Sequence, residues 1–78
     1  MHLKYEIVVE LKKEVLDAEG RAICRNLQAA SYSELNAVEV SKRFILDLDA
    51  DIEKANEIAE KFLTNPVSQT CTVRHLDD

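Results

Sequence analysis

Chemistry at a nucleophile or a transition metal would depend on two cysteines and two histidines, Cys24, Cys71, His2 and His75. The cysteines form no Cys-x-x-Cys pair, and neither histidine has a second histidine or cysteine at metal-ligand spacing. Cys71 and His75 share a predicted strand and would lie about 13 Å apart at roughly 3.3 Å per residue, too far for a nucleophile and its base. Cys24 falls within a predicted helix, where we expect a small buried hydrophobic residue. The sequence therefore predicts no catalytic residue and no metal site.

An alternating acidic run, Asp47, Asp49 and Asp51, has the spacing with which a calcium-binding loop begins. The glycine that such a loop needs at its sixth position is missing, and Ile52 interrupts the run. Because an aspartate side chain accepts a hydrogen bond from a free amide of a first helical turn, we expect Asp49 or Asp51 to cap a helix that begins here.

The charge pattern argues against several classes of partner. The chain has 15 acidic and 10 basic residues and a net charge of −5, and its basic residues do not gather into a patch. Binding to nucleic acid depends on such a patch, so we expect none. The sequence also shows no glycine-rich phosphate loop, no apolar run of membrane-spanning length and no signal-peptide pattern. These features predict a cytoplasmic protein with reduced thiols that binds no membrane.

Hydrophobic periodicity predicts strands and helices along the whole chain, residues 1–78, as a single domain. The predicted elements are a strand over 3–11, a helix over 18–31, strands over 37–40 and 43–48, a helix from about 52 to 63 and a strand over 67–74. This order is that of the α+β, two-layer ferredoxin-like βαββαβ sandwich, in which two helices cover one face of a four-stranded antiparallel sheet.

The two middle strands would form a hairpin. A tight turn at Ser41-Lys42 would set Val38 and Val40 against the 43–48 strand, although the turn lacks the Asn-Gly or Gly-x chemistry of two-residue hairpins. Asn65-Pro66 is expected to end the second helix, because proline cannot continue it.

The apolar residues are expected to meet between the sheet and the two helices. The expected inward set comprises Leu3, Tyr5, Ile7, Val9, Leu11, Ile23, Leu27, Ala30, Val38, Val40, Phe44, Leu46, Leu48, Ile52, Ala55, Ile58, Ala59, Phe62, Leu63, Val67, Cys71 and Val73, with Gln69 as a polar exception.

The turn into the first helix contains the only glycine of the chain. Asp17 is a good N-cap residue, and Glu19 places negative charge at the positive end of the helix dipole. Gly20 then falls inside the first turn, where glycine costs up to about 1 kcal/mol relative to alanine. A glycine at such a position suggests a close approach of backbone or an unusual dihedral angle.

The small size of the chain favours association. Below roughly 70–80 residues a single core seldom supplies more than about 3–5 kcal/mol, and neither a disulfide framework nor a metal site is expected here. Self-association or a partner protein is then the expected source of further stability. A binding or assembly module is favoured over an independent enzyme, because no catalytic constellation is found.

Three segments together resemble the PurS family. Residues 15–23, Val-Leu-Asp-Ala-Glu-Gly-Arg-Ala-Ile, are similar to its Val-Leu-Asp-Pro-x-Gly-x-Ala-x signature, with Ala18 in place of proline. Residues 38–42 resemble its second strand and the Gly-Lys turn that follows, with Ser41 in place of glycine. Residues 62–67, Phe-Leu-Thr-Asn-Pro-Val, resemble the Leu-Leu-x-Asn-Pro-Val that closes its second helix.

The resemblance implies a subunit of phosphoribosylformylglycinamidine (FGAM) synthase, an enzyme of purine biosynthesis. Such a subunit carries no active site and binds no cofactor; ATP and magnesium are used by the PurL-type synthetase subunit. It forms a homodimer or tetramer that bridges this synthetase and a PurQ-type glutaminase and assists ammonia transfer between them. The residues that the resemblance assigns to partner interfaces are Leu16, Asp17, Gly20, Lys42, Asn65 and Pro66.

Two other functions share the predicted fold. A stand-alone regulatory domain of the ACT type would bind a small molecule beside a glycine-containing strand–helix turn at an interface. An acylphosphatase-like enzyme would need a phosphate-binding loop, which has no counterpart in this sequence.

Overall fold

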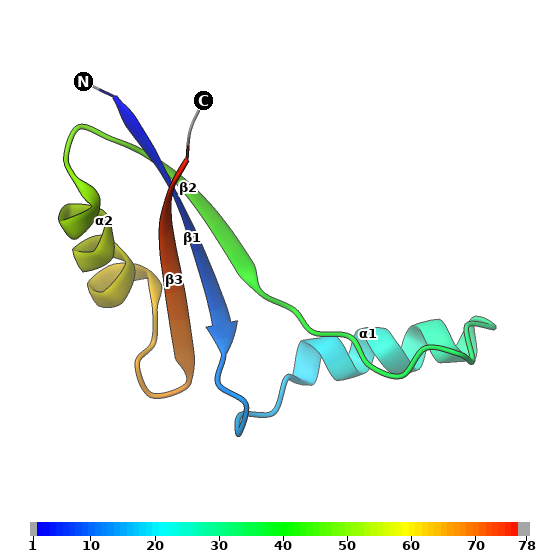
Figure 1. Cartoon of the computed structure of the whole chain (residues 1–78). Coiled ribbons are helices and arrows are strands. Elements are labelled where there is room, and N and C mark those ends of the chain that lie inside the picture. The colour runs from blue at the N-terminus through cyan, green and yellow to red at the C-terminus, as the bar shows by residue number, and fades with distance from the viewer. Residues whose placement is uncertain (1, 77–78) are drawn as a thin grey trace.

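The computed structural model describes residues 2–76 and contains three strands and two helices (Figure 1). The strands are β1 (Leu3–Leu11), β2 (Lys42–Leu48) and β3 (Gln69–Leu76). The helices are α1 (Ala18–Ala29) and α2 (Ile52–Ile58), and α2 continues into a π-helical turn over Ala59–Leu63. No helix in the described part of the chain is long and apolar enough to cross a membrane.

The sheet is antiparallel, with three strands in the order β2-β1-β3. The predicted four-stranded ferredoxin-like sheet is therefore wrong: residues 37–40 form no strand, and Val38 and Val40 do not pair with β2. The predicted strands over 3–11 and 43–48 are present, and the predicted 67–74 strand begins and ends two residues later.

The missing hairpin has a local cause in the turn residues. A two-residue hairpin needs positive φ at one or both central positions, which glycine or asparagine readily supplies. Ser31 is the only residue of the described chain with positive φ, so Ser41 and Lys42 do not turn back on themselves. The chain instead runs from the segment before Ser41 directly into β2 (Figure 1).

The core lies between the sheet and α2. Tyr5, Ile7 and Val9 alternate along β1 and are almost fully buried, as the period-two pattern predicted. Ala59 packs against Ile7 and Val9 from the helical side, and Ala55 of α2 is fully buried. Partly buried apolar side chains surround this centre: Phe44, Leu46, Leu63, Cys71 and Val73. The sheet and α2 therefore form the packed body of the molecule.

The hydroxyl of Tyr5 donates to the carbonyl of Ala50 at 2.8 Å, which fixes the connection from β2 to α2. At the start of α2, Asp51 caps the helix through the amide of Lys54 at 3.3 Å, so the capping prediction for the acidic run is confirmed.

The first helix does not lie on the sheet. Figure 1 shows α1 and the segment 30–41 projecting from the body as an arm, and α1 makes no extensive contact with any strand or with α2. The radius of gyration is 16.0 Å, whereas a compact chain of this length would have about 11–12 Å. The prediction that both helices cover one sheet face is therefore wrong for α1.

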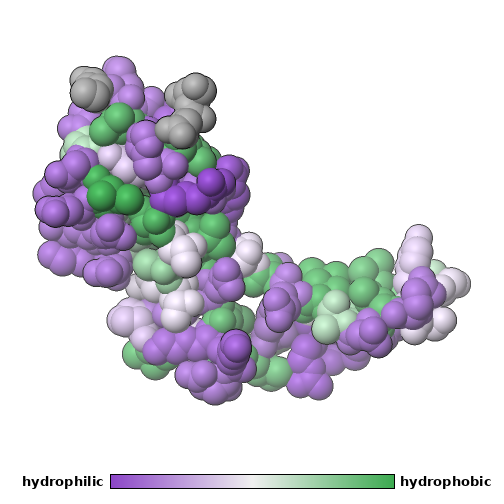
Figure 2. Space-filling view, viewed as in Figure 1, coloured by the Kyte–Doolittle hydropathy of each residue, from purple (hydrophilic) through white to green (hydrophobic). Residues whose placement is uncertain are grey.

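The apolar stripe predicted for α1 is consequently uncovered. Ile23 and Leu27 are 37% and 38% exposed, and Figure 2 shows hydrophobic residues gathered along the arm. Fully burying one such side chain is worth about 1.5–3 kcal/mol, so a partner that covers this face would be stabilising.

Three more large apolar residues of the predicted core lie at the surface, and one of them, Ile52 at the start of α2, is 40% exposed. Phe62 is 78% exposed at the end of the π-helical turn, and Val67 is 82% exposed just before β3. The chain leaves the helical conformation at Thr64, immediately before Asn65-Pro66, as predicted. The loop that follows carries Val67 outward, because β3 starts only at Gln69.

A charged cluster joins all three strands on the opposite sheet face. Glu6 of β1 accepts hydrogen bonds from Arg74 of β3, at 2.6 Å, and from Arg43 of β2. The Glu6 side chain is only 12% exposed. The hydrogen bonds from Arg74 and then Arg43 lower the pKa of Glu6 from 4.5 to about 2.

Candidate assembly surface

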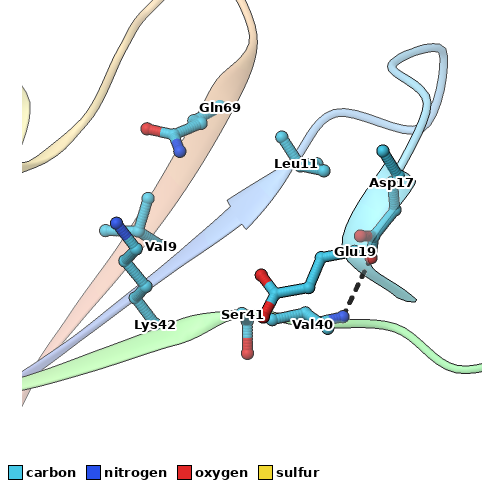
Figure 3. Close-up of a pocket in the computed structure, with 9 residues that line it drawn as sticks. Val9, Leu11, Asp17, Glu19, Val40, Ser41, Lys42 and Gln69 are labelled. Atoms are coloured by element: carbon cyan, nitrogen blue, oxygen red, sulfur yellow. Dashed lines mark hydrogen bonds between the residues drawn. The ribbon is translucent and has the colours of Figure 1, made fainter. Parts of the chain in front are cut away.

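Asp17 lies at the corner where the arm leaves the body. One carboxylate oxygen accepts the amide of Gly20 at 2.8 Å and caps α1; the other accepts the amide of Val40 at 2.9 Å (Figure 3). The hydrogen bond from Gly20 and then that from Val40 lower the pKa of Asp17, so the ionised form is favoured. With both oxygens engaged, this carboxylate holds two segments together and is poorly placed to act as a general base.

Gly20 is where α1 and the returning segment touch. The carbonyl oxygen of Val38 occupies the space into which a Cβ at position 20 would project, and the Asp17 carboxylate lies beside it. The φ angle of Gly20 is not positive, so the glycine is required by close approach rather than by an unusual dihedral. Of the two explanations that the sequence suggested, the close approach is confirmed.

A shallow cavity of about 190 Å³ opens beside this corner. Val9 and Leu11 line one part of it, and Glu19, Lys42 and Gln69 supply polar groups. Figure 3 shows Lys42, Val9 and Gln69 standing across the cavity from Asp17. A second hollow of about 400 Å³ adjoins it and shares Leu11, Asp17 and Val40 with it.

The Asn65-Pro66 corner lies at the same end of the sheet. The Asn65 side chain accepts the amide of Val67 at 3.0 Å, and the Asn65 amide donates to the side chain of Gln69 at 2.8 Å. Gln69 also lines the cavity beside Asp17, and it stands opposite Leu11 in the sheet. The tertiary structure thus connects the Asp17 turn with the Asn65-Pro66 corner through Gln69. The sequence alone placed Gln69 only as a polar residue among inward-facing ones.

The six predicted interface residues differ in what they can present. Leu16 is 63% exposed, and Lys42, Asn65 and Pro66 are also exposed, so their side chains can meet a partner directly. Gly20 is buried and Asp17 is half-buried, and both act within the chain to hold the arm. Their assignment to partner interfaces stays a prediction.

A second polar cluster was missed in the sequence because its members are distant. His2 Nδ1 lies 3.2 Å from a carboxylate oxygen of Asp47 and 3.2 Å from one of Asp49. The β1–β2 register, which sets Leu3 opposite Leu48, brings these residues together. One ligand atom from each lies within 4.8 Å of the others, but all three side chains are exposed to solvent. The contacts of His2 with the two carboxylates hold these side chains together at the surface.

The arrangement offers little for catalysis. Cys24 is 7% exposed and Cys71 is half-buried, and no hydrogen bond joins a cysteine to a histidine among residues 2–76. The ring of His75 packs edge-on against that of Tyr5, with 5.4 Å between centroids.

Comparison with known proteins agrees with this interpretation. Residues 4–77 match the family model PurS, described as phosphoribosylformylglycinamidine (FGAM) synthase. The FGAM synthase subunit PurS of Archaeoglobus fulgidus is 33% identical over 87% of this chain and 91% of its own length. The corresponding subunit of Bacillus subtilis is 34% identical over 82% of this chain and 81% of its own length.

Solved structures show the same fold. The PurS structure from B. subtilis in its C2 crystal form has a TM-score of 0.87 at 29% identity, covering 96% of this chain and 99% of that chain. A chain in the PurLQS structure from Thermotoga maritima has a TM-score of 0.85 at 26% identity, covering 97% of this chain and 99% of that chain. The residue motifs, the family model and these structures agree over nearly the whole length, and the chain belongs to the PurS family of FGAM synthase subunits.

Proposed function

We propose that this chain is the non-catalytic small subunit of a cytoplasmic FGAM synthase, in which it binds both a PurL-type synthetase and a PurQ-type glutaminase. The observation that carries the proposal is the likeness to a chain of the T. maritima PurLQS structure over 97% of the present chain. The absence of a nucleophile–base pair among residues 2–76 supports a bridging role.

The reaction itself belongs to the partners. The glutaminase releases ammonia, and the synthetase uses ATP and magnesium to activate the amide of formylglycinamide ribonucleotide. The small subunit assists the passage of ammonia by holding the two in register. This division of labour accounts for a chain that presents exposed corners and a projecting arm.

Self-association is part of the same proposal. An isolated copy leaves Ile23 and Leu27 of α1 uncovered and has a radius of gyration well above that of a compact chain. A homodimer, or a tetramer built from two dimers, would cover such surfaces and supply stability that a 78-residue chain lacks.

The experiment is a reconstitution of FGAM formation from the cognate synthetase and glutaminase, with and without this chain. We expect glutamine-dependent activity only when the chain is present, whereas ammonia-dependent activity should need the synthetase alone. If the chain changes neither activity and no complex forms, the proposal is wrong. Calorimetry with amino acids and other small metabolites would then test the regulatory, ACT-type alternative.

Two charge-reversal variants test whether Lys42 contacts a partner subunit. Lys42→Glu changes an exposed residue of the predicted interface, and Lys61→Glu changes another exposed lysine, in the π-helical turn that follows α2. We expect Lys42→Glu to reduce glutamine-dependent activity while ammonia-dependent activity is retained, and Lys61→Glu to leave both unchanged. Equal effects of the two variants would remove Lys42 from the interface.

A further inference from the structure

Two arginines lie one turn apart on α1 without a partner. Arg21 and Arg25 are at i and i+4, a spacing that sets Cβ atoms about 5–6 Å apart on a helix. Neither has an ion pair within residues 2–76, whereas the other two arginines of the chain, Arg43 and Arg74, both pair with Glu6. Like charges at this spacing repel each other, so an anion bound between them would relieve an unfavourable interaction.

A hollow of about 360 Å³ opens beside the two arginines, between α1 and the segment that returns along it. Its lining comes from both sides: Arg21, Cys24, Arg25 and Gln28 from α1, and Asn36, Ala37 and Val38 from the returning segment. The side chain of Gln28 donates to the carbonyl of Leu35 at 2.8 Å, which fixes the returning segment against the helix here. None of the lining residues is acidic, so the hollow offers hydrogen-bond donors beside positive charge.

The carboxylates nearest in sequence do not neutralise this pair. Asp17 stands one turn before Arg21, but its two carboxylate oxygens accept the amides of Gly20 and Val40. Glu19 lies two residues before Arg21 and therefore projects from the other side of α1. In a chain with 15 acidic and 10 basic residues, the charge of these two arginines is left for a ligand from outside the chain.

The arginines are also separate from the apolar side of α1. Residues two apart on an α-helix are rotated by about 200°, so Arg21 and Arg25 lie opposite Ile23 and Leu27. A partner that covers the two apolar side chains can therefore leave the arginines and the hollow accessible. The hollow does not depend on the self-association proposed above.

We propose that Arg21 and Arg25, together with Asn36, bind the phosphate group of a phosphate monoester or a free phosphate ion in this hollow. Such a group carries about −1.5 to −2 charges at pH 7 and three acceptor oxygens, which two guanidinium forks match in charge and in paired donors. A carboxylate has one charge and two oxygens, and a single guanidinium satisfies it. The exposed side chain of Asn36 has no hydrogen bond within residues 2–76 and is available to donate to a further oxygen.

The test is a titration of the full ¹⁵N-labelled chain, followed through the Nε–H signals of Arg21 and Arg25 and the side-chain amide of Asn36. The probes are inorganic phosphate, ribose 5-phosphate and acetate at one ionic strength, balanced with sodium chloride. We expect saturable shifts with both phosphates and a dissociation constant roughly fivefold or more below that of acetate. Shifts that sodium chloride alone reproduces, or acetate that binds as tightly as phosphate, overturn the proposal.

The two phosphate probes distinguish the sources of the ligand. Tighter binding of ribose 5-phosphate than of inorganic phosphate assigns the hollow to a phosphorylated sugar or nucleotide. Equal binding assigns it to the phosphate group alone. Either result supports the proposal, because the shared chemistry is the phosphate.

Variants of Arg25 separate the guanidinium fork from its charge. Glutamine is a good helix former without charge, and lysine keeps the charge but lacks the planar fork. We expect the dissociation constant of phosphate to rise roughly fivefold or more in Arg25→Gln and by a smaller factor in Arg25→Lys. Lys61→Gln removes an exposed positive charge from the π-helical turn and should keep the parent value. An equal rise in Arg25→Gln and Lys61→Gln means that phosphate responds only to net charge, and the site is then wrong.

Thermal unfolding gives a readout that does not depend on the arginine signals. A ligand that binds only the folded chain raises its unfolding midpoint. Phosphate should raise the midpoint of the parent chain, relative to sodium chloride of equal ionic strength, by more than that of the double variant Arg21→Gln/Arg25→Gln. Equal rises contradict the proposal. All of these measurements use this chain without the synthetase or the glutaminase, so their failure would leave the proposed function standing.

Discussion

The carboxylate of Asp17 and the amide of Val40 are 23 residues apart in sequence and share a hydrogen bond of 2.9 Å. This bond ties the end of the arm back to its beginning, beside the point where Gly20 meets the carbonyl of Val38. The orientation of the arm, and hence of its exposed helix, depends on this corner.

Asp17→Asn should separate the two roles of this side chain. Asparagine is as good an N-cap as aspartate, so the bond from Gly20 is kept, but its NH₂ group would face the amide of Val40 and that bond would be lost. We expect a lower urea midpoint and faster amide exchange at Val40, with the helical content of α1 unchanged. Asp51→Asn, at the cap of α2, is the control and should keep the exchange rate of Val40 at its parent value.

Acidification should weaken the hydrogen bond between Asp17 and Val40, as Asp17→Asn does. Its pKa is lowered in the folded chain, so its contribution to stability is present above the unfolded value near 3.8 and is lost as the pH falls through the folded pKa. Amide exchange at Val40 measured on descending pH should show this loss in the parent chain, and Asp17→Asn should lack it.

Gly20→Ala should destabilise the arm although alanine is the better helix former. An ordinary helical position gains up to about 1 kcal/mol from this change, but here the added Cβ meets the backbone of Val38. We expect a net loss of roughly 1–3 kcal/mol in urea unfolding, comparable to overpacking. Asn26→Ala, on the exposed side of α1, is the control and should gain about half a kcal/mol.

A larger residue at position 20 tests whether the close approach at Gly20 serves subunit binding or only the stability of the chain. Gly20→Val should weaken binding to the synthetase and glutaminase more than it lowers the stability of the isolated chain, since it displaces the arm from the body. Affinity measured by interferometry and stability measured by urea unfolding give the two quantities. Equal losses in both would make Gly20 a structural residue with no separate part in assembly.

Ser31→Gly should stabilise the end of α1. Ser31 has φ of 88°, and the bonds from Tyr32 to Leu27 (3.1 Å) and from Ser31 to Gln28 (3.3 Å) form a Schellman motif, in which glycine is the favoured residue. Relief of the left-handed conformation, less the entropy of glycine in the unfolded chain, should add about 0.5–1 kcal/mol. Ser33→Gly, in the same loop without positive φ, should be neutral or destabilising in the same thermal melt.

The ion-paired Glu6 should also make the stability of the sheet sensitive to acid. Its pKa falls from 4.5 to about 2 on folding, so its contribution is complete above pH 4.5 and is lost progressively as the pH falls to about 2. Unfolding of Glu6→Gln should depend less steeply on pH in this window than that of the parent chain. Glu10→Gln, on the same strand and sheet face but without an ion pair among residues 2–76, should keep the parent slope.

Local sequence patterns correctly predicted the features that depend on residues close together in the sequence. The alternation along residues 3–11 identified β1 and its buried side chains, Asp17 identified the start of α1, and Asn65-Pro66 identified the end of the second helix. The glycine at position 20 predicted a close approach before the carbonyl that approaches it was known. Each of these features is governed by a few neighbouring residues, so the chain itself carries the information.

The placement of α1 and the fate of residues 37–40 were decided by tertiary structure. An apolar stripe on a helix shows that the helix needs cover, but it does not show whether that cover comes from the same chain or from another. Ser41-Lys42 lacks the residues that favour a tight hairpin turn, and the chain continues straight, so the arm extends and Ile23 and Leu27 stay uncovered. The meeting of the Asp17 and Asn65 corners through Gln69 likewise depends on strand register, which connects residues more than 40 positions apart and has no local signal.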